Sequence, residues 1–146
     1  MTSDHHWQEG LTPDPSSYFG FIYELHHMPT GLRYIGKKQF WASSGKSKRR
    51  DTNKAGDWKE HHWKPSDWRT YASSSKHVKE MMTDKSEWEF CILSQQTCLR
   101  NLNYAEAQQM YYAGVGCLRD LDGELIYLNR KIPEFYGAVD ENYDPS

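Results

Sequence analysis

Long apolar runs, paired cysteines and a leader-like start are all lacking in this sequence, and each absence excludes a class of protein. No stretch approaches the roughly 18 apolar residues that a membrane-spanning helix needs. Residues 1–17 contain no basic start followed by an apolar stretch, which argues against a secretory signal. The three cysteines (Cys91, Cys98 and Cys117) form no C-x-x-C pair. We therefore expect reduced thiols in a cytoplasmic protein rather than a disulfide framework.

Positive charge is concentrated in the middle of the chain. The 146 residues have a formal net charge of −2. Between Arg33 and Glu80, however, 13 lysines and arginines face 5 acidic residues, whereas the rest of the chain holds 5 basic and 15 acidic ones. A basic middle of this kind is typical of a site that binds a polyanion, and a solvated basic loop without a partner gives the same pattern.

Apolar periodicity predicts a small α+β domain, with an antiparallel sheet of about three strands flanked by helices. Residues 18–25 alternate and residues 32–36 form a second strand, with the turn residues Pro29 and Gly31 between them. A helix is expected in residues 73–82, opened by serine, and a second helix begins at Asn103 and ends at Gly114. Residues 87–93 form a central strand, and residues 123–131 are extended.

The ends of the chain and the basic segment lack a clean period. We expect a flexible arm in residues 1–16, a domain in residues 17–137, and a loose acidic tail in residues 138–146. Residues 37–68 form a basic insertion after the second strand, part short helix and part loop. Its tryptophans could stack on bases or form a small core; for Trp68 we favour the core.

Four short motifs, in order, resemble those of the GIY-YIG nuclease domain. They are "FIY" at Phe21–Tyr23, "YIG" at Tyr34–Gly36, the helix "NYAEAQQM" with Glu106, and "YLNRKI" with Asn129. The resemblance covers roughly residues 18–132, and the basic insertion with "SDWRTYASSS" resembles a phage-type subgroup of Seg-like or homing-type endonucleases. Motifs in a fixed order are more specific than any single one, since a lone strand tyrosine or helix glutamate usually serves packing or solvation.

The resemblance implies a metal-dependent endonuclease that hydrolyses phosphodiester bonds in DNA. Glu106 then holds Mg²⁺ or Mn²⁺, and Tyr23 acts as the general base. Tyr34 hydrogen-bonds the attacking water or a phosphate oxygen, and Asn129 orients the backbone or the glutamate. The spacing of Leu102 and Met110 around Glu106 independently predicts that the glutamate is on the partly buried side of its helix.

Basic residues are needed beside these groups for two reasons. A free tyrosine has a pKa of about 10, so Tyr23 needs nearby cations to become a useful base, and Lys37 and Lys38 are the candidates. Phosphates need further cations and hydroxyl groups, and we expect these contacts from Lys46, Lys48, Arg50, Arg69, Ser73, Ser74, Ser75 and Lys76.

Two departures from the family pattern leave alternatives open. Phe21 stands where the first motif has glycine, and the family's helix arginine falls in residues 43–45, where none is present. Arg49 is one catalytic candidate for that role, and the sequence does not distinguish it from other basic residues. They are Arg50, His61, His62 and Arg69, with Lys37 and Lys38 as further sources of charge.

The expected partner is double-stranded DNA, cut with limited sequence specificity unless a partner protein or a homodimer supplies it. Two other functions fit the same motifs: a DNA-binding protein that no longer cleaves, and a phage interaction module. The His-His pairs 5–6, 26–27 and 61–62 lack the spacing of a zinc site.

Overall fold

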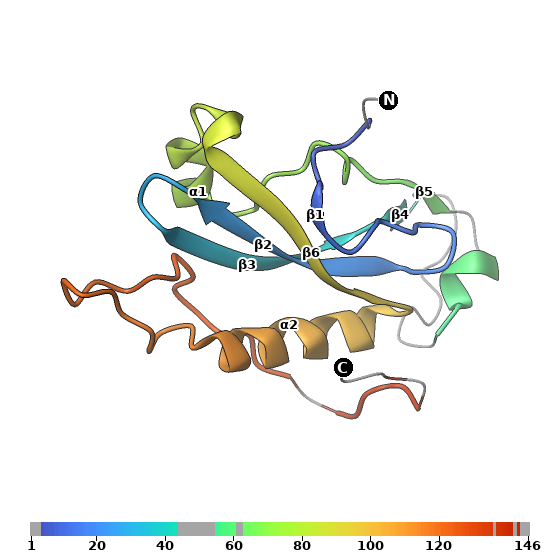
Figure 1. Cartoon of the computed structure of the whole chain (residues 1–146). Helices are drawn as coiled ribbons and strands as arrows, with labels where there is room; N and C mark the ends of the chain where they lie inside the picture. The colour runs from blue at the N-terminus through green and yellow to red at the C-terminus, as the bar shows by residue number, and fades with distance from the viewer. Residues whose placement is uncertain (1–3, 44–54, 61–62, 136, 142, 144–146) are drawn as a thin grey trace.

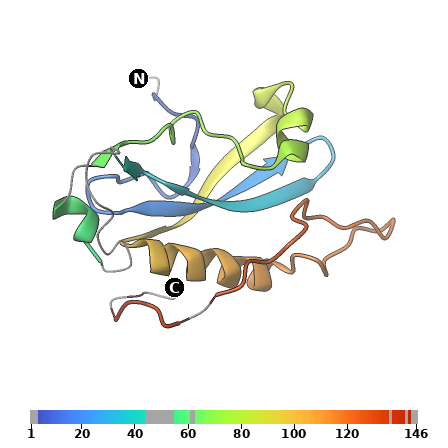
Figure 2. The same ribbon diagram turned by 180° about the vertical axis from the view of Figure 1, so that it is seen from behind.

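Three layers make up the chain (Figure 1). The computed structural model describes residues 4–43, 55–60, 63–135, 137–141 and 143. A twisted sheet forms the middle layer, with α2 (Leu99–Ala113) beneath it. Residues 63–75 cross the opposite side of the sheet, as Figure 2 shows from behind. None of the helices in these ranges is long and apolar enough to cross a membrane.

The predicted hairpin forms the centre of the sheet. Strand β2 (Gly20–His27) pairs antiparallel with β3 (Leu32–Gln39), and Tyr23 lies opposite Gly36. Strand β6 (Trp88–Gln96), the predicted central strand, pairs with the other edge of β2. The strand β1 (Glu9–Gly10) then adds parallel to β6, so the order is β1-β6-β2-β3. The sheet therefore has four strands rather than about three, and β3 is an edge strand.

Both helices form where the sequence predicts them, with shifted starts: the first begins three residues later than expected and the second four residues earlier. Helix α1 (Lys76–Met81) begins after Ser75, whose Oγ accepts a hydrogen bond from the Val78 amide at 3.3 Å. Helix α2 begins after Cys98, four residues before the expected start, because this N-terminus carries no side-chain cap that the sequence could reveal. It ends as expected at Gly114, which has a φ of 80°.

The basic segment contributes a small two-stranded sheet and a helical turn. Strands β4 (Trp41–Ser43) and β5 (Trp63–Pro65) pair antiparallel, and Asp57–Glu60 form the 3₁₀ turn η1. A second such turn, η2 (Lys85–Glu87), precedes β6. The tryptophans of this segment are structural: Trp58 and Trp68 are buried, and Trp41 stacks on Trp58 with ring centroids 5.5 Å apart. The core interpretation of Trp68 is therefore confirmed.

Apolar side chains are buried on both faces of the sheet. On the α2 face, the core includes Ile22 and Ile35 of the strands together with Leu102 and Met110 of the helix. On the opposite face, a cluster rich in aromatic rings contains Trp7, Phe21, Tyr23, Leu25, Phe40, Trp68, Val78, Trp88, Phe90 and Ile92. The alternation predicted for β2 thus separates two cores, and every residue of Gly20–Tyr23 is buried.

The N-terminal segment corrects one expectation. The sequence predicts a flexible arm in residues 1–16, but His6 and Trp7 pack among the rings of the aromatic face, Glu9–Gly10 pair with β6, and Asp14 bonds to Gln95. Trp7 is only 2% exposed and donates a hydrogen bond from its indole to the Trp68 carbonyl at 2.6 Å. Because β1 has only two residues, its sequence has no period from which a strand could be predicted. Near the other end, the Asp140 amide donates to Asn101 on α2 at 2.7 Å, so the tail is not loose at that point.

Candidate active site

A cavity of about 260 Å³ lies at the edge of β3, between α2 and the segment that follows it. Its lining includes residues from three of the four motifs: Tyr34, Glu106 and Asn129. Ser75, from the serine run before α1, contributes to the same wall. The remaining lining residues are Met110, Leu128, Arg130, Lys131 and Pro133. The fold thus gathers motif residues that are far apart in the sequence, such as Tyr34 and Asn129, which are 95 positions apart.

Asn129 closes the free edge of β3. Its amide oxygen accepts a hydrogen bond from the Ile35 amide at 2.9 Å, and its amide nitrogen donates to the Ile35 carbonyl at 2.6 Å. These two bonds replace those of a neighbouring strand, which explains why an asparagine is buried here. Asn129 therefore orients backbone, one of its two expected roles, and holds its own segment beside the cavity.

Glu106 is a buried carboxylate on the inner side of α2. It is 8% exposed, and its neighbours one turn away, Leu102 and Met110, are buried, as the spacing predicts. Burial raises the pKa of Glu106, and the Lys37 ammonium, 3.9 Å from the carboxylate, offsets part of that rise. Lys37 also donates to Asn103, so its charge is shared between two partners.

Tyr23 occupies a different environment from the one expected. It is 1% exposed and is not among the described residues that line the cavity. Its hydroxyl lies directly over Gly36, where the methyl group of an alanine would overlap it, so only glycine fits at this point of β3. Glu106 approaches the sheet from the α2 face, opposite to the face of Tyr23, yet it contributes to the electrostatic environment of the Tyr23 hydroxyl.

The expected direction of the Tyr23 pKa is wrong. Burial raises the pKa of Tyr23 well above its ordinary value, and Tyr71, Tyr34 and Glu106 add to the rise. A hydrogen bond with Ser73 opposes the rise only in part. Neither Lys37 nor Lys38 is among the main groups that shift this pKa. In this geometry Tyr23 is a neutral phenol, not a phenolate activated by lysine.

The two lysines are separated because consecutive strand residues point to opposite faces. Lys37 points to the α2 face and reaches Glu106. Lys38 points to the aromatic face, where its ammonium lies 4.0 Å above the Tyr71 ring and 2.6 Å from Asp67. The same alternation places Tyr34 and Gly36 on the aromatic face.

Tyr71 is a residue that the sequence analysis missed. Its ring lies edge-on to Tyr23, with centroids 6.2 Å apart, and its hydroxyl interacts with Tyr23 and Ser74. Burial raises the pKa of Tyr71 as well. A single tyrosine in "SDWRTYASSS" gives no signal of its own, because only the fold brings it to Tyr23.

Arg130 and Lys131 are also new members of the site. Both are exposed and line the cavity directly after Asn129. Their position directly after Asn129 in "YLNRKI" indicates this placement, because residues that follow one held at the cavity wall lie close to the same wall.

The other residues expected to bind DNA do not all lie at the cavity. Arg69 stacks on Trp68 and pairs with Asp4 at 2.9 Å. The Lys76 side chain is 90% exposed and lies 4.0 Å from Glu80. Ser73 is fully buried, and its Oγ accepts a hydrogen bond from the Ser75 amide at 2.9 Å. Ser74 is exposed and interacts with Tyr71. The candidates that lie outside the described residues are Lys46, Lys48, Arg49, Arg50, His61 and His62.

The donor set around the cavity suits one kind of cation. Within the described ranges, no three residues of the His, Cys, Asp or Glu type gather to hold a metal ion. The Asn129 amide is engaged with Ile35, which leaves the Glu106 carboxylate and the hydroxyls of Tyr34 and Ser75. A cation such as Mg²⁺, which prefers oxygen ligands and keeps several waters, fits a single carboxylate.

A carboxylate, a phenol and two exposed cations around one cavity at the edge of an α+β sheet define a site suited to phosphate-ester chemistry. A scan against protein families matches residues 3–132 to the model described as "Putative endonuclease segE, GIY-YIG domain". The chain therefore belongs to the SegE-type GIY-YIG family, a family of endonuclease domains. Searches of curated proteins and of solved structures found no match.

Proposed function

We propose that this protein is a metal-dependent endonuclease that hydrolyses phosphodiester bonds in double-stranded DNA, with the β3-edge cavity as its active site. One observation supports this most: Tyr34, Glu106 and Asn129, which come from three separate motifs, line a single cavity. The basic segment and the family's nuclease character support DNA as the substrate. We further propose a phage-encoded enzyme that acts in the host cytoplasm with limited sequence specificity.

Glu106 has the role of holding Mg²⁺ or Mn²⁺. A bound cation would neutralise charge on the phosphate and stabilise the leaving oxygen. The raised pKa of Glu106 supports this role, because an unpaired carboxylate is costly to bury unless something positive offsets its charge. Lys37 provides part of that charge in the unliganded protein.

Tyr34 is the phenol that contacts the attacking water or a phosphate oxygen. It lines the cavity, whereas Tyr23 lies behind it with ring centroids 6.4 Å apart. Tyr23, held neutral by burial, positions Tyr34 and the turn that carries Ser73. Arg130 and Lys131 neutralise phosphates at the mouth of the cavity.

Plasmid nicking with Mg²⁺ tests the proposal. Wild type and Glu124→Gln, an exposed glutamate in a surface loop, should nick supercoiled DNA equally. Glu106→Gln should lose activity by roughly 100-fold or more, as expected for loss of electrostatic stabilisation. Equal nicking by Glu106→Gln and wild type would remove Glu106 from the mechanism. Salt-dependent DNA binding without any cut product, in wild type as well, would instead support a DNA-binding protein that no longer cleaves.

A further inference from the structure

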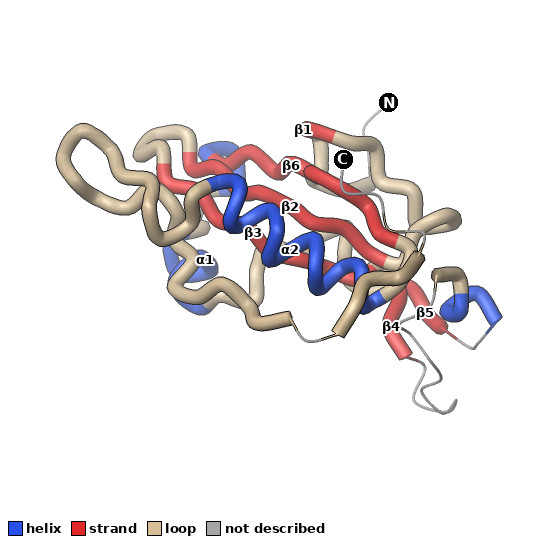
Figure 3. Tube along the Cα trace, turned by 90° about the horizontal axis from the view of Figure 1, so that it is seen from below, coloured by secondary structure: helices blue, strands red, loops and turns tan. Residues whose placement is uncertain are grey.

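The outward side of α2 carries aromatic residues where a surface helix usually carries charge. Tyr104, Gln108, Tyr111 and Tyr112 recur at the spacing of one helical stripe. Tyr111 and Tyr112 are 71% and 75% exposed. The helix has only two charged residues, and one of them, Glu106, is buried. Figure 3 shows α2 crossing the underside of the sheet with the chain that follows it passing alongside.

This stripe forms one wall of a groove with a volume of about 670 Å³. Residues 132–135 form the facing wall, and the ring of Phe135 lies edge-on to Tyr104 with centroids 5.1 Å apart. Four of the nine lining residues are aromatic, and Gln108 adds a polar group whose amide donates to the Tyr112 hydroxyl and accepts from the Tyr143 hydroxyl. A groove of this chemistry suits flat rings with polar edges.

The groove adjoins the cavity of the proposed active site. Pro133 lines both, and on α2 the groove residue Ala107 directly follows Glu106 of the cavity. Arg130 and Lys131 stand on the cavity side of Pro133, while the groove itself contains the acidic Glu134. Cations are thus placed where a backbone phosphate would bind, and uncharged rings lie immediately beyond them.

We propose that this groove binds unpaired nucleobases of the DNA strand next to the cleaved phosphate, stacked on Tyr111 and Tyr112. This rests on the proposed nuclease function and refines its substrate: DNA with a single-stranded or frayed flank binds better than fully paired duplex. The cations and rings follow the order of groups in a nucleotide chain. The cations would hold a phosphate by charge, and the rings next to them would hold the neighbouring base by stacking.

Fluorescence anisotropy on labelled DNA, in EDTA so that no cleavage occurs, tests this inference. Blunt duplex is compared with the same duplex bearing a short single-stranded tail. Wild type and the variant Tyr111→Phe with Tyr112→Phe, which keeps both rings, should bind the tailed duplex more tightly. Tyr111→Ala with Tyr112→Ala should lose roughly 5- to 100-fold of that advantage, yet bind blunt duplex with the affinity of wild type.

The outcomes separate the two proposals. If both duplexes are bound and cut but the alanine pair leaves the tail's advantage intact, the groove assignment is wrong and the nuclease proposal survives. If wild type neither binds nor cuts any DNA, the nuclease proposal fails. Sedimentation of the same proteins adds a check: a wild-type dimer that the alanine pair converts to monomer would make the groove a subunit interface and overturn base binding.

Discussion

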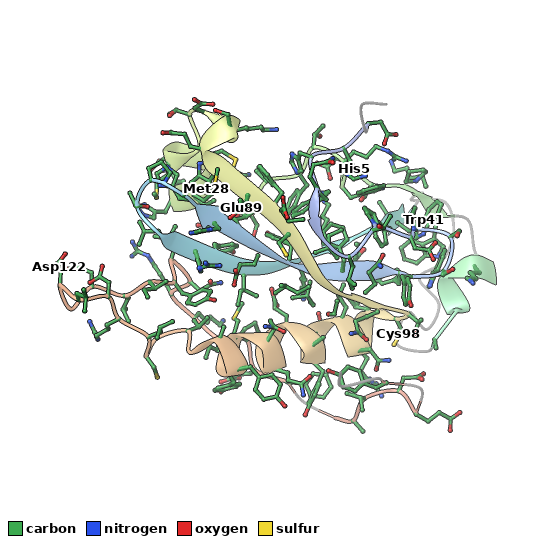
Figure 4. The ribbon with its side chains drawn as sticks, viewed as in Figure 1. His5, Met28, Trp41, Glu89, Cys98 and Asp122 are labelled. Carbon is green, nitrogen blue, oxygen red and sulfur yellow. The ribbon has the colours of Figure 1, made fainter. Side chains whose placement is uncertain are left out.

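Buried polar groups on the two faces of the sheet differ in whether a cavity reaches them. On the aromatic face, Tyr23 is buried beside the Trp7 ring, Tyr71 packs partly buried against Tyr23, and burial raises the pKa of both hydroxyls. On the α2 face, Glu106 is buried too, but a cavity reaches it. Figure 4 shows His5 on the first side and Cys98, just before α2, on the second. A buried polar side chain that no cavity reaches is suited to positioning its neighbours. A buried polar side chain beside a cavity is suited to contacting the substrate.

The largest expected effect is on the closed face. Trp7→Ala should lower the free energy of unfolding by about 3–5 kcal/mol, because a buried ring and its hydrogen bond to Trp68 are both lost. Leu11→Ala, at a residue that is 46% exposed, should change it by less than about 0.5 kcal/mol. Denaturant unfolding measures both. Equal, small losses would mean that residues 4–16 are a mobile arm after all.

A kinetic comparison of the two tyrosines sharpens the contrast between positioning and chemistry. Tyr34→Phe should reduce kcat by roughly 100-fold, since it removes a hydroxyl that contacts the reacting groups. Tyr23→Phe should reduce kcat less, about tenfold or under, because it removes a hydroxyl that only supports its neighbours. Steady-state cleavage at saturating DNA provides the measurement. A larger loss for Tyr23→Phe would restore Tyr23 as the base that the family resemblance implies.

The contributions of the two faces to folding stability should change in opposite directions as the pH falls. On the aromatic face, His6 carries this effect. Burial, including stacking on Phe90, lowers the pKa of His6 to about 4, so the unfolded chain binds a proton that the folded one resists. His6 therefore costs stability as the pH falls from about 6.5 to about 4. The smallest predicted effect follows: His6→Phe should be about 1 kcal/mol less stable at pH 7, for loss of the bond to Tyr71, and less sensitive to acid. If the Tm of His6→Phe and the Tm of wild type change equally with pH across this range, the prediction is wrong.

Local patterns in the sequence predicted the elements that carry their own signals. The β2–β3 hairpin, the Ser75 cap of α1, the end of α2 at Gly114 and the buried side of Glu106 all follow from alternation, caps and helical spacing. Family membership and the α+β class are confirmed by the match to residues 3–132.

Features that depend on distant contacts could not be predicted. The two residues of β1 have no period, and Trp7 is buried only because Trp68 lies 61 positions away and accepts its hydrogen bond. The shift in the pKa of Tyr23 depends on rings that the fold places around it. Strand alternation by itself predicts that Lys37 and Lys38 point to opposite faces, so the two lysines do not act as one source of charge.

Cation-dependent stability of Glu106→Gln and wild type tests the central claim most directly. Because the pKa of Glu106 is raised, its charged form is disfavoured in the folded state. The glutamine variant should therefore unfold at a higher temperature at pH 7 without cation, by a few degrees. That advantage should vanish as the pH falls towards the ordinary glutamate value near 4.3. Added Mn²⁺ should then raise the Tm of wild type in a concentration-dependent way and leave the variant unchanged. An equal Mn²⁺ response in both proteins would contradict a cation site at Glu106.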